Sequence, residues 1–149
     1  MIPEDMKPEL DSMGANLEDW LSWFGNTKLM VAYSTVFWPT FKLLDDCIVG
    51  EQTTQASFDL WRDHLKGDLR GVESVLNHRH LADFHTANKE ETTLDRIRFL
   101  MPILKEIYDA KLKWQFPDRP CKVVLFYPED EADLVGHQIT FWQQKHEEA

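Results

Sequence analysis

Three of the six histidines, His78, His80 and His85, lie within eight residues of one another, and Asp83 stands among them. Imidazole changes its charge near neutral pH and binds divalent metals, so this segment concentrates more potential chemistry than any other. In a chain that is extended after Asn77, the period of two sends His78 and His80 to the same side. His85 or Asp83 then supplies a third ligand to zinc or another divalent metal. The extended conformation therefore predicts a metal or acid/base centre.

A helical conformation of the same segment predicts no such centre, because His78 and His80 diverge by about 200° around a helix axis. A third arrangement places Glu73, Asn77 and His80 along one helical edge, where Asn77 bridges the carboxylate and the imidazole in a structural network. We favour structural histidines, because a histidine cluster without a fixed spacing is weakly specific for a site. We therefore expect no bound metal and no cofactor, and keep a small metal-dependent hydrolase centred on the histidines as the alternative.

No motif of a known enzyme class accompanies the histidines. The sequence contains no GxSxG nucleophile motif, no phosphate-binding glycine loop, no GxGxxG and no HExxH. Cys47 and Cys121 lie in apolar segments, where burial raises the pKa of a thiol and disfavours a nucleophile. We expect two buried, reduced thiols on neighbouring strands, and we favour a binding protein over an enzyme.

Aromatic side chains outside the predicted core are candidates for contact with a partner. Trp20, Trp61 and Trp114 have apolar neighbours at helical spacing, which predicts core packing. Trp23 lies off the apolar stripe of its helix, residues 37–41 form an aromatic turn, and exposed aromatics are typical of binding hot spots. Acidic residues between the two last predicted strands form either a solvated loop or an anionic contact. The candidate contacts are Trp23, Trp38, Phe41, Glu129, Asp130 and Glu131.

The charge of the chain narrows the class of partner. The sequence holds 16 Lys and Arg against 26 Asp and Glu, a formal net charge of −10. Such a charge repels phosphate backbones and anionic lipid surfaces, which argues against nucleic-acid and membrane binding. It speeds the encounter with a basic protein, or it serves solubility alone. We expect a small acidic protein-binding module, an adaptor or an inhibitor or immunity-type protein for a basic partner.

The amino-terminal residues give no indication of secretion. They lack the basic start and the apolar run of a signal peptide. The longest nearly uncharged stretch, residues 29–41, is too short for a transmembrane helix, which needs about 20 residues. We expect a cytoplasmic protein without a transmembrane segment. The sequence does not indicate an oligomeric state.

The pattern of apolar residues predicts an α+β fold. Residues 1–12, with two prolines and four acids, predict a flexible leader before one globular domain over residues 13–149. Helices are expected after Asn16, after Thr54, from Leu69 to about Asn77, and from a capping box at Thr92, with a break at residues 38–39. Strands are expected near residues 46–50, 121–127 and 137–143. We predict four or five helices packed on one side of a small three-stranded antiparallel sheet, formed largely by the carboxyl-terminal hairpin. A mostly helical bundle with one hairpin is the alternative.

Overall fold

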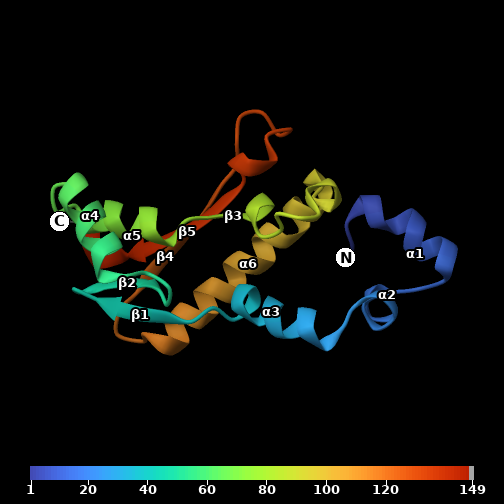
Figure 1. Ribbon diagram of the computed structural model, residues 1–149, viewed down its shortest axis with the longest axis horizontal. Helices are drawn as coiled ribbons and strands as arrows, with labels where there is room; N and C mark the ends of the chain where they lie inside the picture. Colours follow the sequence, from blue (N-terminus) through green and yellow to red (C-terminus); the bar gives the residue numbers. More distant parts are fainter. Residues whose placement is uncertain (148–149) are drawn as a thin grey trace.

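The computed structural model describes residues 1–147. These residues form six α-helices, a three-stranded antiparallel sheet and a separate two-stranded hairpin, so the predicted α+β class is confirmed (Figure 1). The elements in chain order are α1 (Lys7–Met13), α2 (Leu17–Phe24), α3 (Thr27–Phe37), β1 (Phe41–Leu44), β2 (Cys47–Gly50), α4 (Gln55–His64), α5 (Leu69–Asn77), β3 (Arg79–His80), α6 (Leu94–Gln115), β4 (Cys121–Phe126) and β5 (Gln138–Gln143). None of the helices in this part of the chain combines the length and the apolar character that a membrane crossing demands.

Local capping explains where most helices begin. A side chain accepts a hydrogen bond from a first-turn backbone N–H at the start of α2, α3, α4, α5 and α6, and the caps are Asn16, Asn26, Thr54, Asp68 and Thr93. These bonds satisfy donors that have no partner within the helix. The cap of α6 is therefore Thr93, one residue later than predicted. The expected break after α3 is confirmed, because the helix ends at Phe37.

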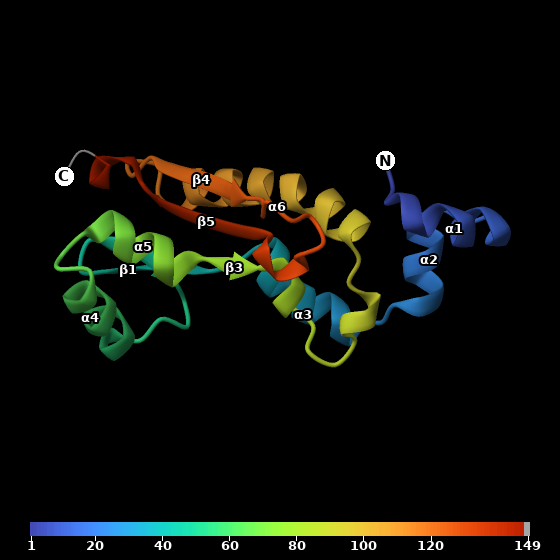
Figure 2. The same ribbon diagram turned by 90° about the horizontal axis from the view of Figure 1, so that it is seen from above.

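The main core lies between α6 and the hairpin of β4 and β5, which pair antiparallel with Val123 opposite Phe141. Ile139 and Phe141 of β5 pack with the apolar face of α6. The other face of β5 meets α5, because the Thr140 hydroxyl donates to the Ser74 carbonyl at 2.7 Å. Figure 2 shows α6 on one side of the hairpin and α5 on the other. Helices therefore cover both faces of the sheet, not one side as predicted.

The predicted pairing of the strand near residues 46–50 is wrong. β2 pairs with β1, and Asp45 and Asp46 make the tight turn between them with positive φ angles of 45° and 70°. Two such residues match the right-handed twist of a hairpin. The third strand of the larger sheet is instead β3, in which Arg79 lies opposite Ile139. A strand of two residues leaves no periodic pattern from which it could be predicted.

The amino-terminal residues form helices rather than a chain without secondary structure. Residues 4–6 make a 3-10 turn and residues 7–13 make α1, in which Leu10 is 1% exposed. The Thr93 hydroxyl donates to Asp5 at 2.8 Å and so links this segment to the start of α6. The mobility predicted for residues 1–12 stays a prediction. Figure 2 places α1 and α2 at one end of the molecule, beyond the sheet.

Candidate functional site

The chain is extended where it leaves α5, and this brings two of the three histidines together. His78 has φ −69° and ψ 141°, and β3 follows immediately. The rings of His78 and His80 meet edge to face with their centroids 5.0 Å apart. Each ring is held through Nδ1 by a backbone carbonyl, at 2.5 Å from Val75 for His78 and at 2.6 Å from Val135 for His80. Of the two conformations considered for the segment after Asn77, the extended one is therefore correct for His78 and His80.

His85 belongs to a different contact. Its Nε2 lies 2.6 Å from the hydroxyl of Tyr33 in α3, and the two rings meet edge to face. Within residues 1–147, no set of three ligand atoms within 4.8 Å of one another includes any of His78, His80, Asp83 or His85. A metal-dependent enzyme centred on the histidines stays a hypothesis, and the geometry gives it no third ligand.

Glu73 and Asn77 of α5 belong to a buried polar network. Glu73 is completely buried, and its carboxylate accepts from Ile48 N at 2.7 Å, from Gln143 N at 2.8 Å and from Gln143 Nε2 at 2.6 Å. The Asn77 side chain accepts from Gly50 N at 3.2 Å and donates to the Ile48 carbonyl at 2.8 Å. The structural network predicted around these two residues exists, but its partners are strand edges and not His80.

These contacts explain why β2 does not pair with β5. Within residues 1–147, β2 has an unpaired edge, and β5 has no strand partner beyond Ile139 on the side opposite β4. The Glu73 carboxylate receives an N–H from each of these strands. Side chains therefore replace the ladder of backbone hydrogen bonds that would have made a single sheet. α5 joins the two sheets by polar contacts, and buried polar groups are tolerated only when they are satisfied in this way.

Among residues 1–147, one group has the ligand types and the spacing for a metal ion. Cys47, Glu73 and His146 offer ligand atoms within 4.8 Å of one another. Each is buried, but the carboxylate already accepts three N–H donors. Burial, with the negative charge of Glu73 as the second cause, raises the pKa of Cys47 to about 12, so the thiol is protonated at neutral pH. These contacts describe a satisfied structural network rather than an open coordination site.

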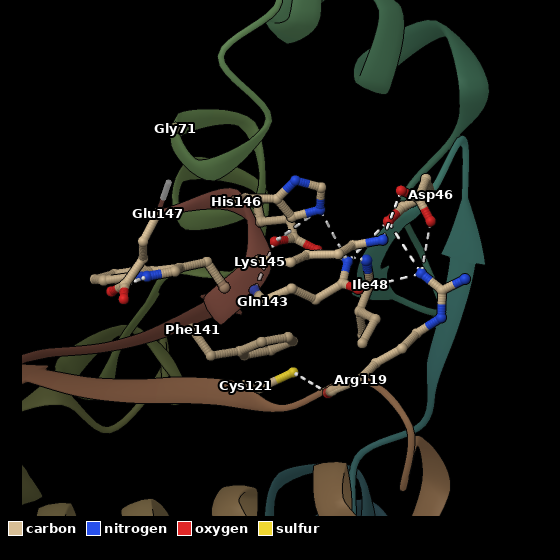
Figure 3. Close-up of polar contacts among 12 residues, drawn as sticks. Asp46, Ile48, Gly71, Arg119, Cys121, Phe141, Gln143, Lys145, His146 and Glu147 are labelled. Carbon is tan, nitrogen blue, oxygen red and sulfur yellow. Dashed lines mark hydrogen bonds and ion pairs between the residues drawn. The ribbon is translucent and has the colours of Figure 1, made fainter. Parts of the chain in front are cut away.

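Asp46 connects the exposed side of this network to two basic residues. Its carboxylate accepts from Lys145 and from Arg119, each at 2.6 Å. The hydrogen bonds from Lys145 and Arg119 lower the pKa of Asp46 from 3.8 to about 2. Arg119 also donates to the Gln143 side-chain oxygen at 3.1 Å. Figure 3 shows how these side chains cross from the β1–β2 turn to the end of β5.

The two cysteines are free thiols on strands that do not pair. Cys47 of β2 is completely buried, whereas Cys121 of β4 is half-buried. The expectation of neighbouring strands is therefore wrong, for the same reason as the predicted sheet. Burial raises the pKa of Cys121 to about 12 as well, and the low reactivity expected of both thiols stays a prediction.

The candidate contact residues are not on one surface. Trp23 is 55% exposed on α2, and Trp38 is 49% exposed after α3, whereas Phe41 is buried against Tyr108 and Phe141. Trp114, which was predicted to lie in the core, is exposed, and its ring centroid lies 5.9 Å from that of Trp38 at an interplanar angle of 46°. Figure 1 shows the loop between β4 and β5 at the top, away from α2 and α3. That loop carries the exposed acids Glu129, Asp130 and Glu131.

A larger apolar surface, on α2 and α3, was missed by sequence reasoning. Neither helix buries a single residue. Six large apolar side chains are 45% to 66% exposed, and we call them the α2–α3 surface: Leu21, Trp23, Phe24, Leu29, Met30 and Val31. The run of Leu29, Met30 and Val31 was the available indication, since consecutive apolar residues in a helix cannot all face one core.

Comparison of the chain with protein families, with curated proteins and with solved structures found no match. The function is therefore argued from the geometry of the chain itself.

Proposed function

We propose that this protein is a protein-binding module whose α2–α3 surface docks a basic protein. The observation that carries the proposal is the exposure of six large apolar side chains on two consecutive helices that bury nothing. Monomeric proteins rarely expose contiguous apolar patches of this kind, and such patches are typical of interaction sites. A helix that is apolar on several sides is normally covered.

The charge around the surface supports a basic partner. Residues 7–37, from α1 to α3, contain four acids, Glu9, Asp11, Glu18 and Asp19, against two lysines, Lys7 and Lys28. The Trp20 indole donates to Glu9 at 3.0 Å, which holds α1 beside α2 and brings acids of both helices to the same end of the molecule. Apolar side chains with an acidic rim fit a contact surface in which Lys and Arg surround apolar groups.

The adaptor and the inhibitor or immunity-type roles are both forms of this proposal. Each needs a specific surface and no catalytic residues. The acidic loop at Glu129, Asp130 and Glu131 lies apart from the α2–α3 surface, so it contributes to long-range attraction rather than to direct contact. The proposal also leaves out Phe41, because this ring is 5% exposed.

Replacement of single exposed side chains tests the proposal. Met30→Asp places a charge on the α2–α3 surface, where Met30 is 62% exposed, and Leu60→Asp places the same charge on α4, where Leu60 is 67% exposed. Both variants are expected to fold, because both sites face solvent. The proposal is supported when the native chain and Leu60→Asp retain a basic protein from host extract and Met30→Asp does not. The purified basic protein must then also bind the native chain directly.

Three outcomes contradict it. The retained protein has an acidic contact surface, or the two variants retain it equally well. Alternatively, sedimentation shows that the native chain forms a stable dimer that Met30→Asp dissociates, in which case a second copy covers the surface.

A further inference from the structure

A pocket of about 610 Å³ opens where α3, the β1–β2 hairpin, α5, β3 and α6 meet. This volume lies within the range of about 300–1,000 Å³ that is typical of small-molecule sites. The pocket contains none of the six residues of the α2–α3 surface and is independent of the proposed function. Its lining combines aromatic rings with many side chains that donate or accept hydrogen bonds.

The Tyr108 phenol provides a buried donor in this pocket. The residue is 4% exposed, and edge-to-face contacts with Phe41 and Phe141 hold its ring. Its hydroxyl makes no hydrogen bond within residues 1–147 and keeps some exposed surface, so it is free to donate to a molecule in the pocket. Burial raises the pKa of Tyr108, so the hydroxyl carries its proton at neutral pH. The pocket therefore contains an O–H donor that has no partner among residues 1–147.

Arg79 brings a positive charge to the same pocket. Four of the six arginines pair with carboxylates: Arg62, Arg96, Arg98 and Arg119. Arg79 has no carboxylate within 4.0 Å among residues 1–147, and its guanidinium instead lies 5.3 Å from the centre of the Phe84 ring. Arg70 also has no carboxylate partner in this part of the chain, but its guanidinium lies 4.7 Å from the centre of the Trp142 ring and does not line the pocket. The planar group of donors of Arg79 matches a carboxylate or a phosphate.

Hydroxyl side chains surround these two groups. Ser34 and Thr35 donate to carbonyls of α3, which leaves their oxygens to accept hydrogen bonds from a ligand. Thr40, Thr53 and Ser57 also line the pocket. Trp38, 49% exposed, adds an aromatic face, and Glu51 adds one carboxylate acceptor. This lining suits a molecule with several hydroxyl groups better than an apolar one.

We infer that this pocket binds a small polyhydroxylated molecule with an anionic group, a sugar acid or a sugar phosphate. Arg79 and the Tyr108 hydroxyl hold the carboxylate or phosphate, and the serine and threonine side chains, with Glu51, bind the hydroxyl groups. Trp38 covers the face of the sugar ring. The pairing of an arginine with a phenol sets the preference for an anion.

Titration calorimetry and amide NMR of the full chain test this inference with three probes: glucose 6-phosphate, glucuronate and neutral glucose. At least one of the anionic sugars is expected to bind and to shift the amide signals of the residues that line the pocket. Neutral glucose is expected to bind at least about tenfold more weakly, because it lacks the charge-assisted hydrogen bonds. Tighter binding of glucose 6-phosphate assigns the phosphate class, and tighter binding of glucuronate assigns the carboxylate class.

Variants complete the test. Arg79→Gln is expected to weaken the binding of the anionic probe by about tenfold or more. Tyr108→Phe, which keeps the ring, is expected to weaken this binding by a smaller factor. Arg98→Gln is the matched control, since this arginine pairs with Glu131 and does not line the pocket. Unchanged affinity in both Arg79→Gln and Tyr108→Phe overturns the inference. Equal binding of glucose, or no binding of any probe at millimolar concentration, overturns it as well.

Discussion

The contact between the two sheets depends on Glu73. A carboxylate without exposed surface is costly unless hydrogen bonds compensate its lost hydration. Here it accepts N–H groups from both strand edges and from the Gln143 side chain. This residue therefore determines how the β1–β2 hairpin sits against β5.

Replacing Glu73 by methionine is expected to destabilise the protein strongly. Methionine fills a similar volume but leaves three buried donors without an acceptor, each at a cost of about 1–3 kcal/mol. We expect the free energy of unfolding in urea to fall by roughly 3 kcal/mol or more. Glu106→Met, at an exposed position of α6, is the control and is expected to have little effect. Equal urea midpoints for the two variants would show that the network contributes nothing.

The two thiols allow a second test at the level of single residues. Burial raises the pKa of Cys47 and of Cys121 from 9.0 to about 12. The folded state therefore favours the protonated thiols, and their contribution to stability is complete below pH 9.0 and is lost as the pH rises toward about 12. In the native protein at mildly alkaline pH we expect slow reaction with a thiol reagent, slowest at the fully buried Cys47. Reaction as rapid as in urea would contradict this environment.

Among the elements, α6 contributes the largest apolar face of the core. Leu104 is 2% exposed on that face, whereas Lys105 points outward and pairs with Asp109 at 2.6 Å. Leu104→Ala is expected to cost about 2–5 kcal/mol through lost burial and a cavity. Lys105→Ala removes a surface ion pair and is expected to cost less than about 1 kcal/mol. Thermal or urea unfolding measures both, and comparable losses would place the core on a different face of α6.

Four of the six helices in residues 1–147, α2, α4, α5 and α6, were predictable because their determinants are local, whereas α1 and α3 were not predicted. Thr54, Asp68 and Asn16 cap helices whose apolar spacing is visible in the sequence. The antiparallel pairing of β4 with β5 was predicted and is confirmed. The pairing of β2 was not predictable, because it depends on side chains that are distant in the chain. Only the folded structure shows that Glu73 occupies the donors at the edge of β2.

The candidate sites were likewise predictable only where their determinants are local in the sequence. The adjacency of His78 and His80 follows from a local change of backbone conformation after α5, and the sequence offered it as one alternative. The pocket joins Arg79 of β3 to Tyr108 of α6, and no spacing in the sequence connects these two residues. The α2–α3 surface was missed because apolar helices are normally interpreted as core.

At the scale of the whole molecule, charge and apolar contact have separate roles. In the proposed complex, the net charge of −10 supplies the long-range attraction for a basic partner, and the exposed side chains of α2 and α3 supply the contact that holds it. Raising the salt concentration is expected to slow association with the captured partner more than it speeds dissociation. Trp23→Ala is expected mainly to speed dissociation, because buried aromatic anchors dominate binding energy. Surface plasmon resonance at several salt concentrations measures both rates, and association that is independent of salt would remove the role of charge.

The location of the binding surface is the central claim, and hydrogen exchange on the complex tests it most directly. Amide exchange of the protein alone is compared with exchange in the presence of the captured partner, peptide by peptide along the chain. The proposal predicts slower exchange in residues 17–37 of α2 and α3, where no side chain is buried in the free protein. It predicts no change around Leu60 of α4. Protection confined to other segments, or no protection in residues 17–37, would contradict it.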